Sequence, residues 1–538
     1  MSVKAESSDT GAVPGLETKS GGLGSRAQAV ALATLCAVLF LTFLDNTVVS
    51  VGLANIQSKL HAGIISLQWV VNGYALVFAS LMLAGGTLGD LLGRKKIMLG
   101  GVGVFCAGSV VAALAPNVDW LIVGRVVMGI GAAASEPGTL SIIRHVYPDK
   151  KTRADALGVW AAVSGLALAL GPVIGGVLVG ISDWRAIFWF NLAIGAVAFS
   201  MAFVFVPETS DRRGRRVDIP GIVLAAGALA AMSFAVIQGE QSGYFTWWIL
   251  ALFALSAATG VIFVLVEHKT HDPMLDLSMF KRPPFWGSNF VAFACYFGTF
   301  SIFFFTALYL QVVANASPYQ TALDFIPMAA GLIIASALTG PWIGRIGPRI
   351  PMTVGCVLAA GGILATRAVL SPTVDFTTLG FILPIAGIGF GMALVPVTST
   401  PLTVVRPERS GMAASATNTS RELGAVFGVA VLGAIVNAKL TGELGARLKQ
   451  IGIPPSLQGF VLHAVTGGGL GSSGEANQAE HSKNAEIAQI ATKVVKAAYA
   501  AFGSGLDVAL EISGVLLLIG AVIAVFTIHR TAGQTYDL

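Results

Sequence analysis

Residues 86–96 read GTLGDLLGRKK, a short basic stretch with three glycines. It lies between apolar runs at 67–88 and 97–116. Each run can cross a bilayer, whose hydrocarbon core takes about 20 apolar residues. The loop is too short to hold a domain, so the two runs are expected to form a tight helical hairpin at the membrane surface. Gly86 and Gly93 permit close backbone approach at this turn.

The charged residues of this loop have two interpretations. Asp90 can bond the first turn of a neighbouring helix or pair with Arg94, and so hold the hairpin in one conformation. An ordinary basic loop at the membrane surface is the alternative. The first interpretation makes Gly86, Asp90, Gly93 and Arg94 candidate residues of a conformational switch.

Composition excludes an ordinary soluble protein. The chain has 538 residues, of which 55% are hydrophobic and 11% charged, whereas soluble domains have about 25% charged residues. Backbone polar groups in hydrocarbon must be satisfied within their own segment, and the alternation typical of a β-barrel is absent. The fold class is therefore predicted to be an all-α integral membrane protein. The fourteen predicted spans are 28–53, 67–88, 97–116, 119–142, 155–180, 185–207, 217–239, 247–266, 285–313, 321–343, 350–371, 376–403, 411–437 and 506–528.

The basic residues sort to one side of the predicted membrane. Alternate short loops hold almost none of them, apart from Lys59 and Arg185. An excess of Lys and Arg marks cytoplasmic loops, so both termini are predicted to be cytoplasmic in a multi-pass protein of the plasma membrane. The net charge of +5 thus indicates orientation rather than nucleic-acid binding. The basic loops contain Arg94–Lys96, Arg144–Arg153, Arg212–Arg216, Lys269–Arg282, Arg345–Arg349 and Arg406–Arg409.

A weak internal repeat divides the chain into two halves of six helices. Residues 28–207 hold the first six spans and residues 285–528 hold six more, with a linker at 208–284 that contains two inserted spans. Two such halves suit alternating access, in which one half rocks against the other around a central cavity. Residues 1–27 are expected to form a disordered cytoplasmic tail, and residues 529–538 a short cytoplasmic tail.

The last loop is unusually long. Residues 438–505 are predicted to be extracellular, with an amphipathic helix over 485–502 and a flexible link over 467–474. A surface cap is the favoured role for this segment, and a binding role is the alternative.

No motif predicts catalysis, a metal or a cofactor. HExxH, a nucleophile elbow and a GxxxxGK[ST] phosphate loop are absent from the sequence. The four cysteines all fall in apolar runs without metal-ligand spacing. Neither an enzyme nor an ATP-driven pump is indicated.

Two spans carry ionisable residues that are costly in a bilayer. Asp45 costs about 2.5–3.5 kcal/mol to insert, so it is expected to face the bundle interior as the first candidate for proton coupling. A helix-end position at the outer interface is the alternative. Arg125 and Glu136 are eleven residues apart, so they share a helix face about 16 Å apart. A buried Arg near an acid can couple protonation to conformation, and a wet cavity wall is the alternative for Glu136.

The fifth span contains Gly171-Pro172-Val-Ile-Gly175-Gly176. Gly171 and Gly175 make a small-xxx-small face for close helix packing, and Pro172 adds a bend. We predict that Gly171, Pro172, Gly175 and Gly176 take part in the conformational change. Generic helix packing is the alternative.

These motifs resemble those of the major facilitator superfamily, and within it the fourteen-helix drug/proton antiporters. Residues 86–96 are similar to the superfamily's signature between its second and third helices, and 344–349 is a degraded echo of it. Residues 44–51 resemble the antiporters' first-helix signature, although Ser50 stands where Asn is usual. Residues 125–131 resemble the fourth-helix Arg motif, and 171–176 the motif that separates antiporters from symporters.

Weaker matches extend the resemblance over most of residues 40–430. They lie at 183–191, at the exit of the ninth span, and at 411–428 in the thirteenth, where Glu422 replaces the usual Gln. Arg421 and Glu422 are expected either to form an intramembrane pair or to line the cytoplasmic vestibule.

Candidate substrate-binding residues come from the second half. Asp324 at the start of the tenth span can attract cations, although a solvated acid at a helix N-terminus is the favoured alternative. The aromatic residues of the ninth span suit amphipathic drugs, although lipid-facing Phe is also common. The candidate set is Phe304, Tyr309, Gln311, Asp324, Asn418 and Arg421.

The resemblance implies two six-helix pseudo-repeats with two inserted central helices. It implies export of amphipathic or cationic compounds from the cytoplasm or inner leaflet in exchange for protons. The exporter is expected to be a monomer in a bacterial cell membrane, in contact with lipid and without a cofactor. A dedicated exporter of one metabolite, antibiotic or lipid is the alternative, and a membrane sensor or scaffold without transport is the alternative of another class.

Overall fold

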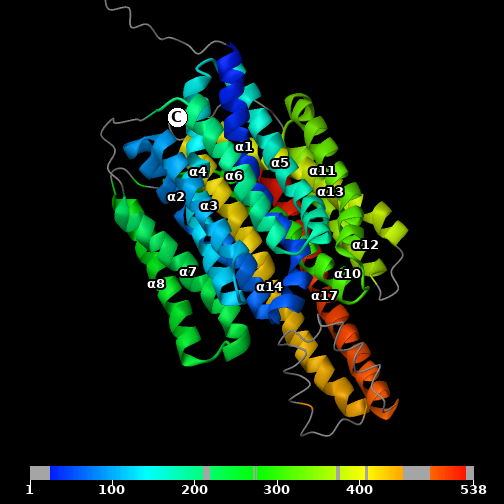
Figure 1. Ribbon diagram of the computed structural model, residues 1–538. Helices are drawn as coiled ribbons and strands as arrows, with labels where there is room; N and C mark the ends of the chain where they lie inside the picture. Colours follow the sequence, from blue (N-terminus) through cyan, green and yellow to red (C-terminus); the bar gives the residue numbers. More distant parts are fainter. Residues whose placement is uncertain are drawn as a thin grey trace, which may run out of the picture.

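The structure, a computed structural model, describes residues 25–209, 218–270, 273, 275–370, 376–405, 410–451, 458 and 485–528. The predicted tail at 529–538, the link at 467–474 and most of the tail at 1–27 lie outside these residues. In the part that is described, every regular element is a helix (Figure 1).

The helices follow one another in two sets of six, with a pair between them. The first set is α1 (Ser25–Leu60), α2 (Ile64–Leu92), α3 (Arg94–Ala113), α4 (Val118–Val146), α5 (Lys150–Ile181) and α6 (Arg185–Phe205). The pair is α7 (Ile219–Ser242) and α8 (Trp247–Lys269), followed by the short 3-10 helix η1 (Leu277–Lys281). The second set is α9 (Pro283–Ser301) continued by η2 (Ile302–Thr306) and α10 (Ala307–Val312), then α11 (Pro318–Ile346), α12 (Arg349–Val369), α13 (Phe376–Thr403), α14 (Ser410–Ile451) and α17 (Ala485–Thr527).

The fourteen predicted spans are confirmed as helices that are long and apolar enough to cross a membrane. Several helices extend past the predicted limits, because hydropathy marks only the apolar part of a helix. α14 continues to Ile451, and α17 begins at Ala485, so the helix predicted over 485–502 is continuous with the last span. The ninth span contains a π-helical turn at Ile302–Thr306 that the sequence pattern did not indicate.

The two faces of the bundle differ. We call the face where α1 begins and α17 ends the tail side, and the opposite face the loop side. On the loop side, the ends of α14 and α17 project from the bundle together as a hairpin (Figure 1). Its seam is apolar, because Leu444 and Leu448 of α14 and Ala498 and Phe502 of α17 are buried.

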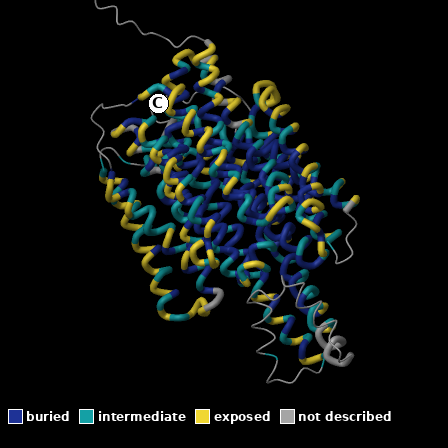
Figure 2. The backbone as a smooth tube through the Cα atoms, in the orientation of Figure 1, coloured by how far each residue is buried: buried dark blue, intermediate teal, exposed yellow. Residues whose placement is uncertain are grey.

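Burial separates a central bundle from a peripheral pair. Buried segments gather in the middle of the molecule, whereas α7 and α8 lie along one edge and are largely exposed (Figure 2). α9 is the most buried of the spanning helices. α7 packs against α2 and α14, with the rings of Trp69 and Phe234 5.3 Å apart.

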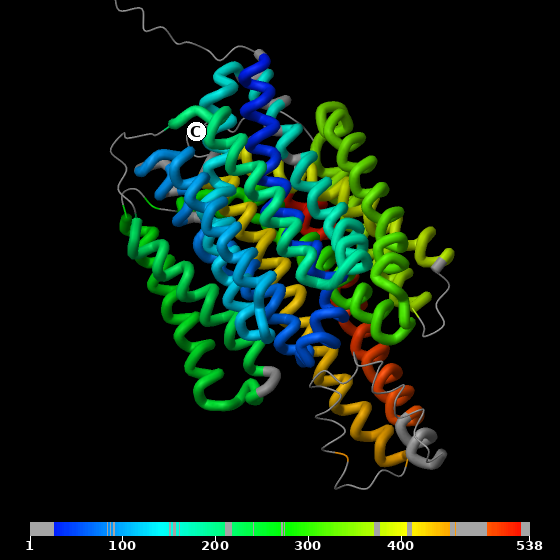
Figure 3. The backbone as a smooth tube through the Cα atoms, in the orientation of Figure 1, coloured from blue at the N-terminus to red at the C-terminus, as the bar shows by residue number. Residues whose placement is uncertain are grey.

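The two sets of six helices meet along two seams, α5 against α11 and α2 against α14 (Figure 3). On the loop side the contact is close. A Cβ added at Gly176 would lie 2.6 Å from the carbonyl oxygen of Pro318, and Gln311 Nε2 donates to the Val51 carbonyl at 2.9 Å. The loop side is therefore the closed side of the interface.

Candidate functional site

A buried ion pair lies inside the first set of helices. Asp45 of α1 and Arg125 of α4 are both fully buried, and Arg125 Nη1 donates to Asp45 Oδ2. Asn191 of α6 donates through Nδ2 to Asp45 Oδ1 at 2.6 Å. Asp45 thus lies in the bundle interior, and both of its oxygens accept a hydrogen bond.

The guanidinium of this pair is also anchored. Arg125 Nε donates to the Val70 carbonyl of α2 at 2.7 Å, and the guanidinium carbon lies 4.5 Å from the centre of the Tyr74 ring. The Tyr74 hydroxyl donates to the Thr42 carbonyl of α1 at 2.9 Å. Four helices of the first set are joined through this arrangement, which we call the N-half ion pair (Asp45, Arg125, Asn191, Tyr74).

A second buried polar cluster joins the two halves. Glu136 of α4 accepts a hydrogen bond from Asn418 Nδ2 of α14 at 3.1 Å. Glu422, one turn further along α14, accepts from Asn46 Nδ2 of α1 at 3.3 Å. Arg421 lies between Asn418 and Glu422 in the sequence. These three side chains and those of Glu136 and Asn46 are at most 6% exposed. We call the set Asn46, Glu136, Asn418, Arg421 and Glu422 the cross-half cluster.

Arg421 contacts both halves but pairs with neither glutamate. Its Nη1 donates to Asn418 Oδ1 at 3.0 Å, and its Nη2 donates to the Tyr296 hydroxyl of α9. The guanidinium carbon lies 4.7 Å from the Tyr296 ring centre and 5.2 Å from that of Phe43 on α1. Of the two alternatives for Arg421 and Glu422, the ion pair is therefore not formed, because the two side chains leave α14 toward different partners.

The two arrangements differ in net charge when their acids are ionised: the N-half ion pair is neutral, and the cross-half cluster is not. The N-half ion pair contains one carboxylate and one guanidinium, whereas the cross-half cluster contains two carboxylates and one guanidinium. Glu136 Oε2 and Arg421 Nε have no hydrogen-bond partner among the described residues. Since burying an unpaired charge is costly, the cross-half cluster requires a further positive charge when both glutamates are ionised.

The glycines of the fifth span make close contacts on two sides of α5. A Cβ at Gly171 would lie 2.9 Å from the Val48 backbone nitrogen and would overlap the Thr47 side chain, and Gly175 faces the Val48 carbonyl. Gly176 instead faces Pro318 and Ala322 of α11. The motif around Pro172, which lies inside α5, therefore packs α5 on α1 within one half and on α11 across the interface.

The turn at 86–96 is held by an acid outside the motif. Gly93 has φ +112°, and an added Cβ there would lie 2.8 Å from Glu208 Oε1. Glu208 Oε1 accepts from the Lys95 backbone nitrogen at 3.2 Å, and Arg94 N donates to the Thr209 carbonyl at 2.9 Å. Glu208 thus occupies the α3 N-terminus, one of the two positions predicted for Asp90. The Asp90 side chain lies outside the described part of the structure. A Cβ added at Gly86 would lie 3.3 Å from Pro137 Cβ of α4.

Most predicted substrate-binding residues are buried. Phe304, like the neighbouring aromatic residues of η2, faces the protein interior and not lipid, and Tyr309 stacks on Phe502 with ring centres 6.2 Å apart. Asp324 is 8% exposed, so the favoured prediction of a solvated acid is wrong. It lies more than one turn inside α11, and its Oδ2 has no hydrogen-bond partner among the described residues.

A cavity of about 30 Å³ adjoins the cross-half cluster on its tail side. Pockets for drug-sized ligands measure about 300–1,000 Å³, so the halves must separate further on the tail side before such a ligand enters. No group of three or more His, Cys, Asp or Glu suited to a metal ion occurs among the described residues. The cavity is lined by Leu140, Trp160, Thr398, Leu402, Ala414, Thr417 and Asn418.

Sequence reasoning brought together only part of this site. Asp45 and Arg125 meet, and Asn418 and Arg421 meet, but Asp324 and Gln311 lie apart from both arrangements. Asparagine, tyrosine and glutamate partners were missed. An amide or hydroxyl in an apolar span is a weak signal, because such groups can bond their own helix backbone. The missed partners are Asn46, Tyr74, Asn191 and Tyr296, together with Glu208 at the tail-side surface. Glu422 was expected beside Arg421, but its bond to Asn46 was not.

Comparison with known proteins agrees with this architecture. The model of the Major Facilitator Superfamily matches residues 35–429. The multidrug resistance protein Stp of Mycobacterium tuberculosis is 33% identical over 438 residues, which cover 81% of each chain. The methylenomycin A resistance protein of Streptomyces coelicolor is 32% identical over 444 residues, covering 82% of this chain and 93% of that protein.

A longer alignment and a solved structure complete the comparison. The tetracenomycin C resistance and export protein of Streptomyces glaucescens is 27% identical over 515 residues, covering 95% of this chain and 93% of that protein. A bacterial homolog of the human lysosomal transporter Spinster, in an inward-facing and unoccupied conformation, has a TM-score of 0.59 at 18% identity, covering 95% of this chain and all of that chain. This last likeness shows the fold alone. Because the family model matches residues 35–429 and the first two relatives are 33% and 32% identical over most of their length, the chain belongs to the Major Facilitator Superfamily.

Proposed function

We propose that this transporter exports amphipathic, cationic drugs in exchange for protons. Relatives named for multidrug and antibiotic resistance support drugs as the substrates, and the excess of buried carboxylates supports a cationic one. The observation that carries the proposal is the cross-half cluster, in which two buried carboxylates face one guanidinium at the interface between the halves. A proton or a cationic substrate can supply the missing positive charge, so the two ligands compete for the same site. Exchange of one for the other is antiport.

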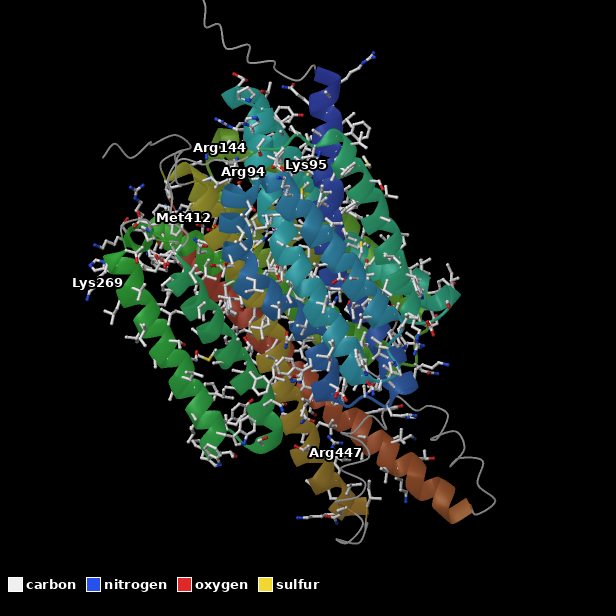
Figure 4. All side chains as sticks on the ribbon, turned by 60° about the vertical axis from the view of Figure 1, so that its left-hand side comes forward. Arg94, Lys95, Arg144, Lys269, Met412 and Arg447 are labelled. Atoms are coloured by element: carbon white, nitrogen blue, oxygen red, sulfur yellow. The ribbon has the colours of Figure 1, made fainter. Side chains whose placement is uncertain are left out.

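The tail side is proposed to face the cytoplasm. The labelled basic residues Arg94, Lys95, Arg144 and Lys269 lie toward this end of the molecule, whereas Arg447 lies on the projecting hairpin (Figure 4). Short loops rich in Lys and Arg stay in the cytoplasm. The proposal thus includes cytoplasmic termini in a cell membrane, and a monomer driven by the proton gradient without a cofactor.

The contacts between the halves suggest which step of the cycle this conformation represents. The loop side is closed by Gly176 and Gln311, and the cavity lies on the tail side of the cluster. A substrate from the cytoplasm or inner leaflet would enter as α4 and α5 move away from α13 and α14. Asp324 adds a buried carboxylate on α11 whose Oδ2 has no hydrogen-bond partner among the described residues. Rocking of the halves would then close the tail side and open the loop side.

Ethidium transport in proteoliposomes tests the proposal. An acid-inside pH gradient should drive ethidium into the lumen, and each ethidium that enters should be matched by proton exit, followed with a trapped pH dye. Nigericin should abolish accumulation, because it collapses the pH gradient. Folded, reconstituted protein that moves neither ethidium nor protons would contradict proton-coupled export and favour a sensor or scaffold.

A dedicated exporter of one antibiotic is the second candidate. Two of the relatives above carry the name of a single compound, methylenomycin A or tetracenomycin C. Competition between ethidium and a panel of unrelated cations separates the two candidates. A broad exporter is inhibited by most of the panel, whereas a dedicated exporter is inhibited by close analogues of one compound only.

A further inference from the structure

The contacts across the interface form a reciprocal pair. α14 contributes one amide and one carboxylate, Asn418 and Glu422, which are four residues apart and therefore on one face. The first half contributes the opposite partners, Glu136 from α4 and Asn46 from α1. Each carboxylate thus bonds an amide of the other half, and neither bonds a guanidinium within its own half.

The choice of partner decides which carboxylate can exchange a proton. The guanidinium of Arg125 carries a permanent positive charge, so it stabilises the ionised form of Asp45 and opposes its protonation. An asparagine NH₂ is uncharged and can donate either to a carboxylate oxygen or to the carbonyl oxygen of the protonated acid, and Asn418 does so while its own oxygen accepts from Arg421. The contacts of Glu136 with Asn418 and of Glu422 with Asn46 therefore persist in both protonation states.

The surroundings of the two glutamates provide one positive charge for two negative ones. Glu422 and Arg421 are the charged neighbours that act on Glu136, and Arg421 is the one that acts on Glu422. The N-half ion pair nearby is neutral as a whole. The other titratable groups that face the cluster are Tyr74, Cys295 and Tyr296, which are uncharged at neutral pH.

We propose that Glu136 and Glu422 together hold a single exchangeable proton, and that Asp45 stays ionised throughout the cycle. The inference rests on the proposed proton coupling and names its site. Separation of the halves removes both amides from both carboxylates at once, so the glutamates meet water only on the side that is open. A cationic substrate that enters beside Asn418 replaces the proton, which leaves to the water on that side.

Substrate-induced proton release from the purified protein tests this assignment. Ethidium is added to unbuffered detergent solution of full-length protein, and released protons are counted with a pH dye. Glu136→Gln and Glu422→Gln should each reduce release at least tenfold. Glu511→Gln is the matched control, because Glu511 is a glutamate of a spanning helix that is 52% exposed and bonds Arg367; it should release as many protons as wild type.

Moving the carboxylate across the interface sharpens the test. The double variant Glu136→Gln/Asn418→Glu keeps one amide and one carboxylate in contact but exchanges the helices that carry them. It should recover a substantial part of the release that Glu136→Gln loses, whereas a specific structural role of Glu136 on α4 predicts no recovery. Ethidium binding, followed by its fluorescence, shows that each variant is folded and competent.

The outcomes separate this inference from the proposed function. Wild-type protein that binds ethidium without releasing protons overturns proton antiport itself. If wild type releases protons and both glutamine variants release as many, the site is misassigned. Loss of release in Asp45→Asn alone, with ethidium binding retained, assigns the proton to Asp45 instead.

Discussion

The N-half ion pair and the cross-half cluster use the same kinds of residue to different effect. Asp45 and Arg125 are joined directly, each has further partners, and all of these come from the first six helices. Glu136 and Glu422 are joined to the opposite half by single amide contacts, with donor–acceptor distances of 3.1 and 3.3 Å. A pair whose partners all come from one rigid body stabilises that body, whereas contacts between two bodies must break in each transport cycle.

The glycines of α5 repeat this contrast in packing. Gly171 and Gly175 meet the α1 backbone inside the first half, and Gly176 and Gly180 meet α11 across the interface. Loss of the first pair separates helices that should stay together throughout the cycle. Loss of the second pair affects one conformation only.

The largest effect is expected for Gly171→Leu. The added side chain overlaps Thr47 and the Val48 backbone, so α5 and α1 must separate. Overpacking costs about 1–3 kcal/mol and occasionally more. The shift also breaks the hydrogen bond from Thr47 Oγ1 to the Leu168 carbonyl. Ethidium efflux from cells should be lost although the protein still inserts in the membrane.

Gly158→Ala is the control for this prediction. Gly158 lies on the same helix, but a Cβ added there meets nothing within 4 Å. Efflux should be unchanged in this variant. Normal efflux by well-expressed Gly171→Leu, or by Pro172→Leu, would remove the α5 motif from the mechanism.

The second largest effect is expected for Asp45→Asn on stability. The substitution leaves the Arg125 guanidinium buried without its counter-charge, which costs about 3–5 kcal/mol when one partner of a buried pair is removed. Thermal unfolding in detergent should occur at a markedly lower temperature than in wild type. Glu422→Gln is the comparison, because it removes the excess charge of the cross-half cluster and should leave stability unchanged or raise it. Equal destabilisation by both variants would mean that the two arrangements do not differ.

The fold could be predicted from the sequence because the bilayer imposes it. Spans of about 20 apolar residues and alternating basic loops give the number of helices, and no tertiary contact is needed to find them. Asp45 and Arg125 could be placed inside the bundle for the same reason, since each is too costly in lipid.

The hydrogen-bond partners of the two buried glutamates could not be predicted. Asn46 and Glu422 are 376 residues apart, and Glu136 and Asn418 are 282 apart, so only the docking of the two halves brings them together. Asp324 was misjudged because its place near a helix start suggests solvent, whereas the packing of α11 on its neighbours buries it.

A smaller effect is expected for Gly176→Leu, which affects only the contact between the halves. A Cβ at Gly176 lies 2.6 Å from the Pro318 carbonyl and close to Ala322, so a larger side chain disfavours the conformation closed on the loop side. Folding should be nearly normal, and the population should shift toward loop-side opening. A spin-label distance between Ile181→Cys of α5 and Leu323→Cys of α11, both at exposed positions, measures the shift on this background. An unchanged distance distribution would show that this seam does not separate during transport.

The smallest effect is expected at the tail-side turn, where Glu208 bonds the first turn of α3. Glu208→Gln keeps the side-chain oxygen that accepts from Lys95 N but loses the negative charge near the helix N-terminus, which is worth about 0.3–1 kcal/mol at an exposed site. Turnover should therefore change by about 2- to 5-fold in a direction set by which state the turn stabilises, while ethidium affinity stays constant. Asp90→Asn is the matched variant within the motif, and we expect it to slow turnover more than it weakens binding. If only Asp90→Asn alters turnover, the conformational switch belongs to the motif itself. If neither Asp90→Asn nor Glu208→Gln alters turnover, residues 86–96 form an ordinary basic loop. The difference between contacts within one half and contacts that separate is then confined to the N-half ion pair and the cross-half cluster.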